Sequence, residues 1–351
     1  MSFVLGRGEG ALADGPVGRL GTYRAVDGSE GAPLYLDLDG PHAAFVVGKR
    51  GYGKSYTLGV IAEALAGVEA VAPVVVDPMG VFATLAEPAT DPPVPATVVE
   101  TPAVAPDAFD PRSWCALLGL SPERGAGGLV WQAAAERSSL SGMSRAVGEA
   151  DAPRTDRLAA RNHLALADSW DVFDPAGLDA AMLAASAVTV LDVSGLDRAP
   201  MNAVVRGVAE ALYRGRLDGR LERLPWLLVD ESHAFFDGVA REALERLLTR
   251  GRAPGVSLVA ATQRPSAIPP VGLSQADLLL AHRLTAQRDV DALRAARPTY
   301  MERSLTARMP ARPGEVVVVD DATETVHGAH IRRRRTPHGG ASPRASDIDL
   351  A

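Results

Sequence analysis

Seven stretches of the chain are almost continuous runs of apolar, largely β-branched residues, and most of them end in a polar residue or a glycine. The runs are 43–48 (AAFVVG), 72–77 (APVVVD), 187–193 (AVTVLDV), 224–231 (LPWLLVDE), 255–263 (GVSLVAATQ), 276–284 (ADLLLAHRL) and 314–321 (GEVVVVDD). Runs of this kind are typical of strands that are covered on both faces. Helical periodicity separates several of them, at 54–67, 202–217 and 239–251. The alternation predicts an α/β fold with a mostly parallel, doubly wound sheet.

One long segment interrupts this alternation, because it contains helical stretches at 127–138 and 156–170 but no clear strand pattern. We interpret it as a helical insertion into the sheet domain. A strand-like stretch at 33–39 stands alone near the N-terminus, and the last residues are small and polar, which favours flexibility. The predicted organisation is 1–41 (short N-terminal β segment), 42–100 (core, first part), 101–185 (helical insertion), 186–330 (core, second part) and 331–351 (basic, then flexible C-terminal tail).

Composition narrows the classes of protein that fit this pattern. The net charge is −7, so the chain as a whole is not a polybasic nucleic-acid binder, and any contact with DNA must be a local patch. The single Cys115 cannot form a disulfide within the chain, which fits a reducing compartment. No apolar run approaches the roughly 18 residues that span a bilayer, and the start lacks the apolar core of a signal peptide. We expect a cytoplasmic protein with no membrane partner.

The octapeptide GKRGYGKS at 48–55 fits the phosphate-binding pattern G-x-x-x-x-G-K-[ST]. A predicted buried strand precedes it and a predicted helix follows it, which argues against a chance glycine-rich turn. Glycines let consecutive backbone N–H groups surround phosphates, and the helix N-terminus adds its positive end. Lys54 is expected to contact the β- and γ-phosphates of ATP, and Ser55 to hold Mg²⁺. The predicted nucleotide-binding residues are Gly48, Lys49, Arg50, Gly51, Tyr52, Gly53, Lys54, Ser55 and Tyr56.

Lysine usage supports this interpretation of the loop. The chain has 36 lysines and arginines, of which only Lys49 and Lys54 are lysines, and both lie in this octapeptide. A phosphate loop needs a compact charge on a flexible stem, which the planar fork of arginine does not supply. Lys49 is given no catalytic role.

A second pair of candidate residues ends the apolar run at 224–231. An aspartate at this position, Asp230, can hold Mg²⁺, and the adjacent Glu231 can orient and polarise an attacking water, which implies hydrolysis. An acidic strand end that caps the next helix is the alternative, and the pair is informative only because it follows a phosphate loop.

Polar residues around the run at 255–263 are weaker candidates. Gln263, at the end of the run, can sense the γ-phosphate if its strand lies beside that of the phosphate loop. Arg250 and Arg252 lie just before the run, where an arginine of a ring ATPase can reach the nucleotide of a neighbouring subunit. A solvated arginine at a helix end is nearly as common. The run HIRRRR at 330–335 can contact phosphates of DNA or of a neighbour's nucleotide, but a solvated charge run is the more frequent case.

Taken together, these stretches resemble the HerA/FtsK superfamily of ring-forming ATPases, and most closely its HerA-like branch. The resemblance rests on the phosphate loop, LLVDESHAFF (227–236), RGRAPGVSLVAATQRPS (250–266), VVVDPMG (74–80), VTVLDVSGLD (188–197) and RTPHGG (335–340). It implies a RecA-like P-loop NTPase core that forms a homo-hexamer, hydrolyses ATP with Mg²⁺ and translocates or processes double-stranded DNA.

Carried onto this sequence, the resemblance also assigns roles to individual residues. Lys54 becomes the nucleotide contact and Ser55 a metal contact. Asp230 becomes the metal-binding acid and Glu231 the acid that activates water. Gln263 becomes the γ-phosphate sensor and Arg252 the arginine that acts on the neighbouring subunit.

Two departures from the family pattern limit what the resemblance implies. Residues 1–41 are too short for the N-terminal β-barrel of HerA proteins, so a nuclease partner that docks through that barrel is in doubt, although a nuclease or other DNA-processing partner stays open. Val81 stands where the family has an acidic residue after the Asp-Pro-x-Gly turn. The alternatives are a conjugation or viral genome-packaging motor of the same superfamily, and a P-loop ATPase that does not translocate but acts as a switch in a regulatory or defence complex.

Overall fold

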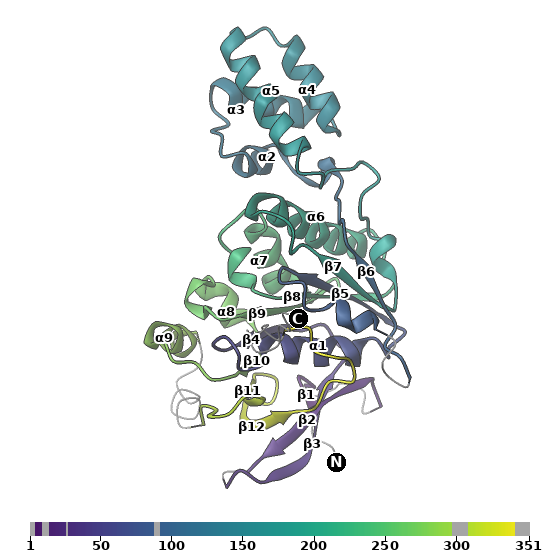
Figure 1. Ribbon diagram of the computed structural model, residues 1–351, viewed down its shortest axis with the longest axis vertical. Coiled ribbons are helices and arrows are strands. Elements are labelled where there is room, and N and C mark those ends of the chain that lie inside the picture. Colours follow the sequence, from purple (N-terminus) through teal and green to yellow (C-terminus); the bar gives the residue numbers. More distant parts are fainter. Residues whose placement is uncertain (1–3, 9–13, 26, 88–91, 297–307, 341–351) are drawn as a thin grey trace, which may run out of the picture.

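The computed structural model describes residues 4–8, 14–25, 27–87, 92–296 and 308–340. Within these residues, all named strands belong to one twelve-stranded sheet, which runs through the middle and lower part of the molecule in Figure 1. Seven neighbouring strands are parallel, in the order β10 (Leu278–Ala281), β4 (Ala43–Val47), β9 (Ser257–Thr262), β8 (Leu224–Val229), β5 (Val71–Asp77), β7 (Val188–Asp192) and β6 (Ala96–Val99). The predicted α/β fold with a mostly parallel sheet is therefore confirmed.

The other edge of the sheet is largely antiparallel and was only partly predicted from the sequence. Beyond β10 the order continues with β11 (Glu315–Asp320), β12 (Thr325–Ile331), β2 (Val17–Arg24), β3 (Glu30–Asp37) and β1 (Val4–Leu5). The pairs β10–β11, β11–β12, β12–β2 and β2–β3 are antiparallel, whereas β1 is parallel to β3. The N-terminal strands thus extend the main sheet.

Burial of the central strands explains their continuous apolar runs. Every residue of β4, β5, β9 and β10 is buried. Successive side chains of β4 alternate between two hydrophobic clusters, so that Phe45 and Val47 join one and Ala44 and Val46 join the other. Because each face has its own core, both faces must be covered.

Helices cover the two faces unequally. One cluster contains residues of α1 (Lys54–Leu65) and of the antiparallel edge, and the other contains α6 (Arg198–Leu217), α7 (Arg241–Arg250) and residues of α8 (Pro270–Gln275) and α9 (Gln287–Ala295). The helices α1, α6 and α7 occupy the three helical segments that were predicted between the apolar runs. None of the described helices is both long enough and apolar enough to cross a membrane.

The predicted insertion is represented by four helices that stand away from the sheet at the top of Figure 1. They are α2 (Pro111–Leu117), α3 (Gly125–Glu136), α4 (Leu140–Glu149) and α5 (Arg154–Asp168). Asp110 caps α2, since its Oδ1 accepts hydrogen bonds from the backbone N–H groups of Arg112 and Ser113. Trp114 of α2 is buried against Phe173, with 4.7 Å between the ring centroids.

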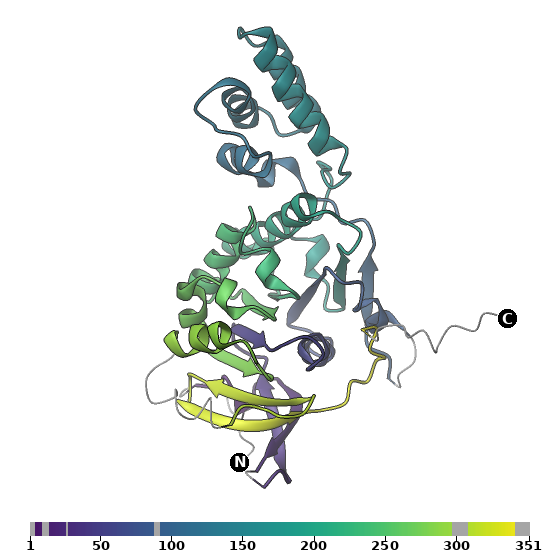
Figure 2. The same ribbon diagram turned by 60° about the vertical axis from the view of Figure 1, so that its left-hand side comes forward.

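After β12 the chain stays in contact with the rest of the molecule. Residues 332–340 pack against α1, and Figure 2 shows this yellow segment passing beside that helix. We call residues 332–340 the strap. The sequence predicted the start of a basic tail here, with a solvated charge run as the more frequent case for HIRRRR. Arg333 and Arg335 are exposed, as in such a run, but Arg334 is only 9% exposed because it lies on the helix. The predicted flexible end, 341–351, lies outside the described residues.

Candidate nucleotide site

The phosphate-binding octapeptide connects β4 to α1 at the carboxyl edge of the parallel sheet. Gly53 is the residue before α1 and has φ 108°, in the left-handed region that favours glycine. Gly51 also has a positive φ of 81°. At Gly48 an added Cβ would lie 2.5 Å from the Cβ of His282, so only glycine fits there. The sequence therefore forms a tight loop that leads directly into the N-terminus of α1, where anions are stabilised.

Lys54 and Ser55 lie against the acidic end of β8, as the sequence predicted for a metal-binding pair. The Ser55 hydroxyl donates a hydrogen bond of 2.6 Å to Oδ2 of Asp230, which is fully buried. Lys54 is 5% exposed, and burial lowers the pKa of its ammonium while the charges of Glu231 and Asp230 oppose that shift. Burial raises the pKa of Asp230, and the Ser55 hydrogen bond opposes this. A hydroxyl and a carboxylate in contact fit the ligand preference of Mg²⁺.

Glu231, the residue after Asp230, has a strained backbone conformation. Its φ is 43° and its ψ is 41°, which is uncommon for a residue with a side chain. Its Oε2 is buried and has no hydrogen-bond partner, although Nδ1 of His233 lies 3.3 Å away. Burial raises the pKa of this carboxyl group, opposed by the charge of Lys54 and a side-chain hydrogen bond from Gln263. A more basic carboxylate with a free oxygen is suited to accept a proton.

The strand order explains why Gln263 meets Glu231. The strand β9 pairs with β4 on one side and β8 on the other, so its carboxyl end lies between the phosphate loop and the acidic pair. Gln263 directly follows β9 at that edge. The structure thus brings together Lys54, Ser55, Asp230, Glu231 and Gln263, all of which were predicted from the sequence.

A cavity of about 540 Å³ opens above this cluster. Six of the nine predicted loop residues line it, namely Arg50, Gly51, Gly53, Lys54, Ser55 and Tyr56. Gly48, Lys49 and Tyr52 do not; the ammonium of Lys49 lies 4.5 Å from the ring centroid of Tyr52. Glu231 lines the same cavity, and so do residues of the strap.

Two groups that shape this loop were not predicted from the sequence. Nε2 of His282 lies 2.9 Å from the Thr57 hydroxyl, and the imidazole is completely buried beneath the loop. Burial, and then the charge of Lys54, lower the pKa of His282 to about 3, so the imidazole is neutral. Its position at the end of the apolar run 276–284 was the available signal. The strap residues of the cavity were also missed as parts of the site.

Arg252, in contrast, lies at the other edge of the sheet. It precedes β9, whose amino end is opposite to the phosphate loop because β4 and β9 are parallel. Its guanidinium pairs with Asp277 at 3.0 Å, and its side chain is 55% exposed. Arg250 is also exposed. Within one chain, therefore, Arg252 does not reach the site.

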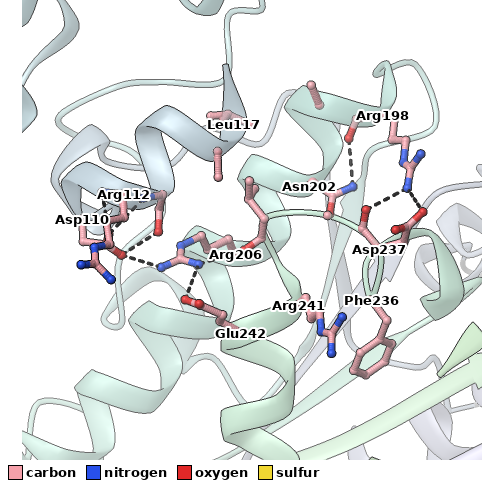
Figure 3. A pocket seen from close by; sticks show the side chains of 15 residues that line it. Asp110, Arg112, Leu117, Arg198, Asn202, Arg206, Phe236, Asp237, Arg241 and Glu242 are labelled. Carbon is pink, nitrogen blue, oxygen red and sulfur yellow. Dashed lines mark hydrogen bonds and ion pairs between the residues drawn. The ribbon is translucent and has the colours of Figure 1, made fainter. Parts of the chain in front are cut away.

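A larger cavity of about 770 Å³ lies apart from the phosphate loop, between α2, α6 and α7 (Figure 3). Three polar side chains, spaced four residues apart on one face of α6, point toward the segment that follows Glu231. Arg198 donates to the carbonyl of Asp237, Asn202 to that of Ala234 and Arg206 to that of Val239, at 2.8–3.2 Å. Arg206 also binds Asp110, the cap of α2, at 2.9 Å. This row holds the segment after Glu231 and joins it to the helical insertion.

Comparisons with known proteins agree on the fold. VirB4 of Thermoanaerobacter pseudethanolicus matches with a TM-score of 0.68 and 16% identity, over 92% of this chain and 97% of that one. A bacterial conjugative coupling protein, TrwBΔN70, matches with a TM-score of 0.58 and 15% identity, over 94% and 98% of the two chains. No protein-family model and no curated protein matches the sequence. The predicted RecA-like P-loop fold is confirmed by these two matches.

Proposed function

We propose that this chain, which has the fold of the HerA/FtsK superfamily, is an ATP-hydrolysing ring motor that translocates or processes double-stranded DNA. The observation that carries the proposal is that Lys54, Ser55 and Glu231 line one cavity, with Asp230 bound to Ser55 behind them. A phosphate loop alone binds nucleotide, but a second acid with a free oxygen beside it provides a base for hydrolysis.

The proposed chemistry follows from the positions of these side chains. The backbone N–H groups of the loop and the Lys54 ammonium bind the β- and γ-phosphates, while Ser55 and Asp230 would hold Mg²⁺. When bound, Mg²⁺ neutralises charge on the phosphate oxygens. Glu231, which lines the cavity, takes the proton from the attacking water on its carboxylate. Gln263, in contact with Glu231, links the state of the γ-phosphate to the position of that base.

Conjugative DNA transfer is the variant of this function that one observation favours, because one of the solved structures similar to this chain is a bacterial conjugative coupling protein. The N-terminal strands β1–β3 lie in the main sheet and offer no separate domain for a nuclease within the described residues. A packaging motor and a non-translocating switch are the alternatives that an experiment has to separate.

The ATPase rate with and without duplex DNA, measured together with the mass of the assembly, tests this function. We expect a homo-hexamer in the presence of ATP and Mg²⁺ and hydrolysis that rises severalfold when duplex DNA is added. A monomer whose ATPase rate ignores duplex DNA would support the switch and contradict the motor.

Arg252 is proposed to act on the nucleotide of the neighbouring subunit. It is exposed at the edge opposite to its own site, so it can serve only in trans. An arginine that neutralises transition-state charge is worth about 10³–10⁵ in rate. We therefore expect Arg252→Ala to leave ATP binding and assembly intact and to depress hydrolysis strongly, as measured by steady-state phosphate release.

Mixed rings provide the control for this role. An Arg252→Ala subunit keeps its phosphate loop and a Lys54→Ala subunit keeps its arginine, so rings that contain both should recover activity that neither variant shows alone. Absence of recovery in rings whose mixed composition has been verified by mass would contradict the role of Arg252 and make Arg250 the next candidate.

A further inference from the structure

A fully buried carboxylate lies in the last turn of α1, about two and a half turns beyond Lys54. Glu63 interrupts the apolar stretch VIAEAL, yet its side chain has no solvent exposure. Its oxygens accept hydrogen bonds from the backbone N–H groups of Arg335 and Thr336, from the Thr336 hydroxyl and from the Arg332 guanidinium, at 2.7–3.1 Å. Although burial opposes ionisation, these donors hold the pKa of Glu63 below its ordinary value. The proposed hydrolysis does not use this group.

The partners of Glu63 all belong to the strap, which runs back along α1 toward the phosphate loop. The Arg334 side chain is 1% exposed and lies on Gly59, where an added Cβ would be 2.7 Å from the guanidinium carbon. The backbone N–H of Arg334 donates to the Tyr56 hydroxyl at 2.6 Å. The strap is therefore fixed to α1 at Glu63, Gly59 and Tyr56.

Beyond these contacts the strap enters the cavity of the phosphate loop. Arg333, His338 and Gly340 line the cavity together with Lys54. The ring of His338 packs edge-on against that of Tyr56, with 5.4 Å between centroids. At Gly339 an added Cβ would lie 2.9 Å from the carbonyl oxygen of Val81, so the strap also lies close to the turn after β5. The strap thus forms one wall of the cavity.

The lining of the cavity combines two kinds of chemistry. Lys54, Ser55 and the loop glycines supply charge and N–H groups, whereas Tyr56, His338, Met79 and Val81 supply rings and apolar atoms. A nucleoside triphosphate has the same division between its phosphates and its base. Partial burial and the nearby Arg334 lower the pKa of His338, which favours the neutral imidazole, the form suited to stacking.

We propose that the strap forms the base subsite of this nucleotide site, in which a purine ring stacks on His338 beside Tyr56, and that Glu63 positions the strap. This inference rests on the proposed function and deepens it. His338 contacts the ligand, and Glu63 acts through the strap.

Competition between ATP and inorganic tripolyphosphate tests the subsite, because tripolyphosphate has no base. Stacking of a base on a ring is worth about 1–3 kcal/mol, and every 1.4 kcal/mol is tenfold in affinity. We expect His338→Ala to weaken ATP binding about tenfold and to leave tripolyphosphate binding unchanged. His163→Ala, in the helical insertion, is the matched control and should change neither affinity.

Other outcomes overturn the inference. Unchanged affinities in His338→Ala, or an equal loss for both ligands, would exclude a base subsite at His338. The proposed function itself fails if the binding of ATP and of tripolyphosphate does not depend on Lys54. Failure of the proposed function can therefore be told apart from failure of the base subsite.

Limited trypsin digestion tests the positioning role of Glu63. Release of the strap from α1 frees the backbone after Arg332–Arg335 for the protease, so Glu63→Gln should accelerate cleavage there. In the wild-type chain, ATP should slow this cleavage more than tripolyphosphate does. Cleavage at the wild-type rate in Glu63→Gln would contradict its role. If that variant does not fold, the protection of the wild-type strap by ATP and the His338→Ala affinities still decide the matter.

Discussion

Lys54→Ala is expected to lower the affinity for ATP by about 10–100-fold, since hydrogen bonds to charged groups are worth about 1.5–3 kcal/mol and every 1.4 kcal/mol is tenfold. Lys54 is the buried ammonium at the phosphate end of the cavity, and it sits among the N–H groups of the loop. The loss should appear as a higher Kd for ATP in calorimetry at moderate salt, and tripolyphosphate binding should fall with it.

Two controls make this result specific to the loop. Arg220→Ala removes an equal charge from the exposed end of the α6 region and should leave the Kd unchanged. The thermal unfolding of Lys54→Ala has to be followed as well, because the substitution leaves Asp230 and Glu231 without their nearest cation. An unaltered Kd in a folded Lys54→Ala variant would mean that the loop does not bind phosphate.

The parallel core and the centre of the site could be predicted from the sequence for one physical reason. Strands that are buried on both faces must be apolar throughout, so a polar residue marks the point where such a strand reaches the edge of the sheet. Asp230 and Gln263 are marked in this way, and the parallel order of β4, β9 and β8 brings them to the same edge as Ser55.

Apart from β11, the antiparallel edge lacked that signal. Most residues of β12, with the sequence TVHGAHI, are only partly buried, and β2 is partly exposed as well. Half-exposed strands tolerate polar residues and glycine, so neither shows a continuous apolar run. Their pairing joins Ile331 to Gly21, positions that are far apart in the sequence. Sequence periodicity contains no information on such a distant pairing.

The strap illustrates the same limit for charged residues. Four consecutive arginines are usually solvated, but here Arg334 is buried, and the strap is held by Glu63, which lies 272 residues before Arg335 in the sequence. The sequence did contain one sign of this arrangement, namely a glutamate on the buried face of an otherwise apolar helix. A buried carboxylate needs donors, and these donors had to come from another segment.

Glu231→Gln is expected to retain ATP binding and to lower the rate of hydrolysis by about 10²–10⁴-fold, the usual contribution of a general base. The amide is nearly isosteric but cannot take a proton from water. Glutamine is no less suited than glutamate to a φ of 43°, so the backbone strain at this position does not change. Loss of one negative charge beside the phosphates should keep ATP affinity equal or make it higher. Single-turnover hydrolysis at saturating ATP and a separate binding titration measure the two effects.

Glu222→Gln is the matched control, because it makes the same change at an exposed residue just before the amino end of β8, opposite to the site. It should bind and hydrolyse ATP as the wild type does. Hydrolysis at the wild-type rate in Glu231→Gln would remove this carboxylate from the mechanism. A loss of binding together with a lower melting temperature would assign Glu231 a structural part, because a general base acts on the chemical step and not on the affinity for the substrate.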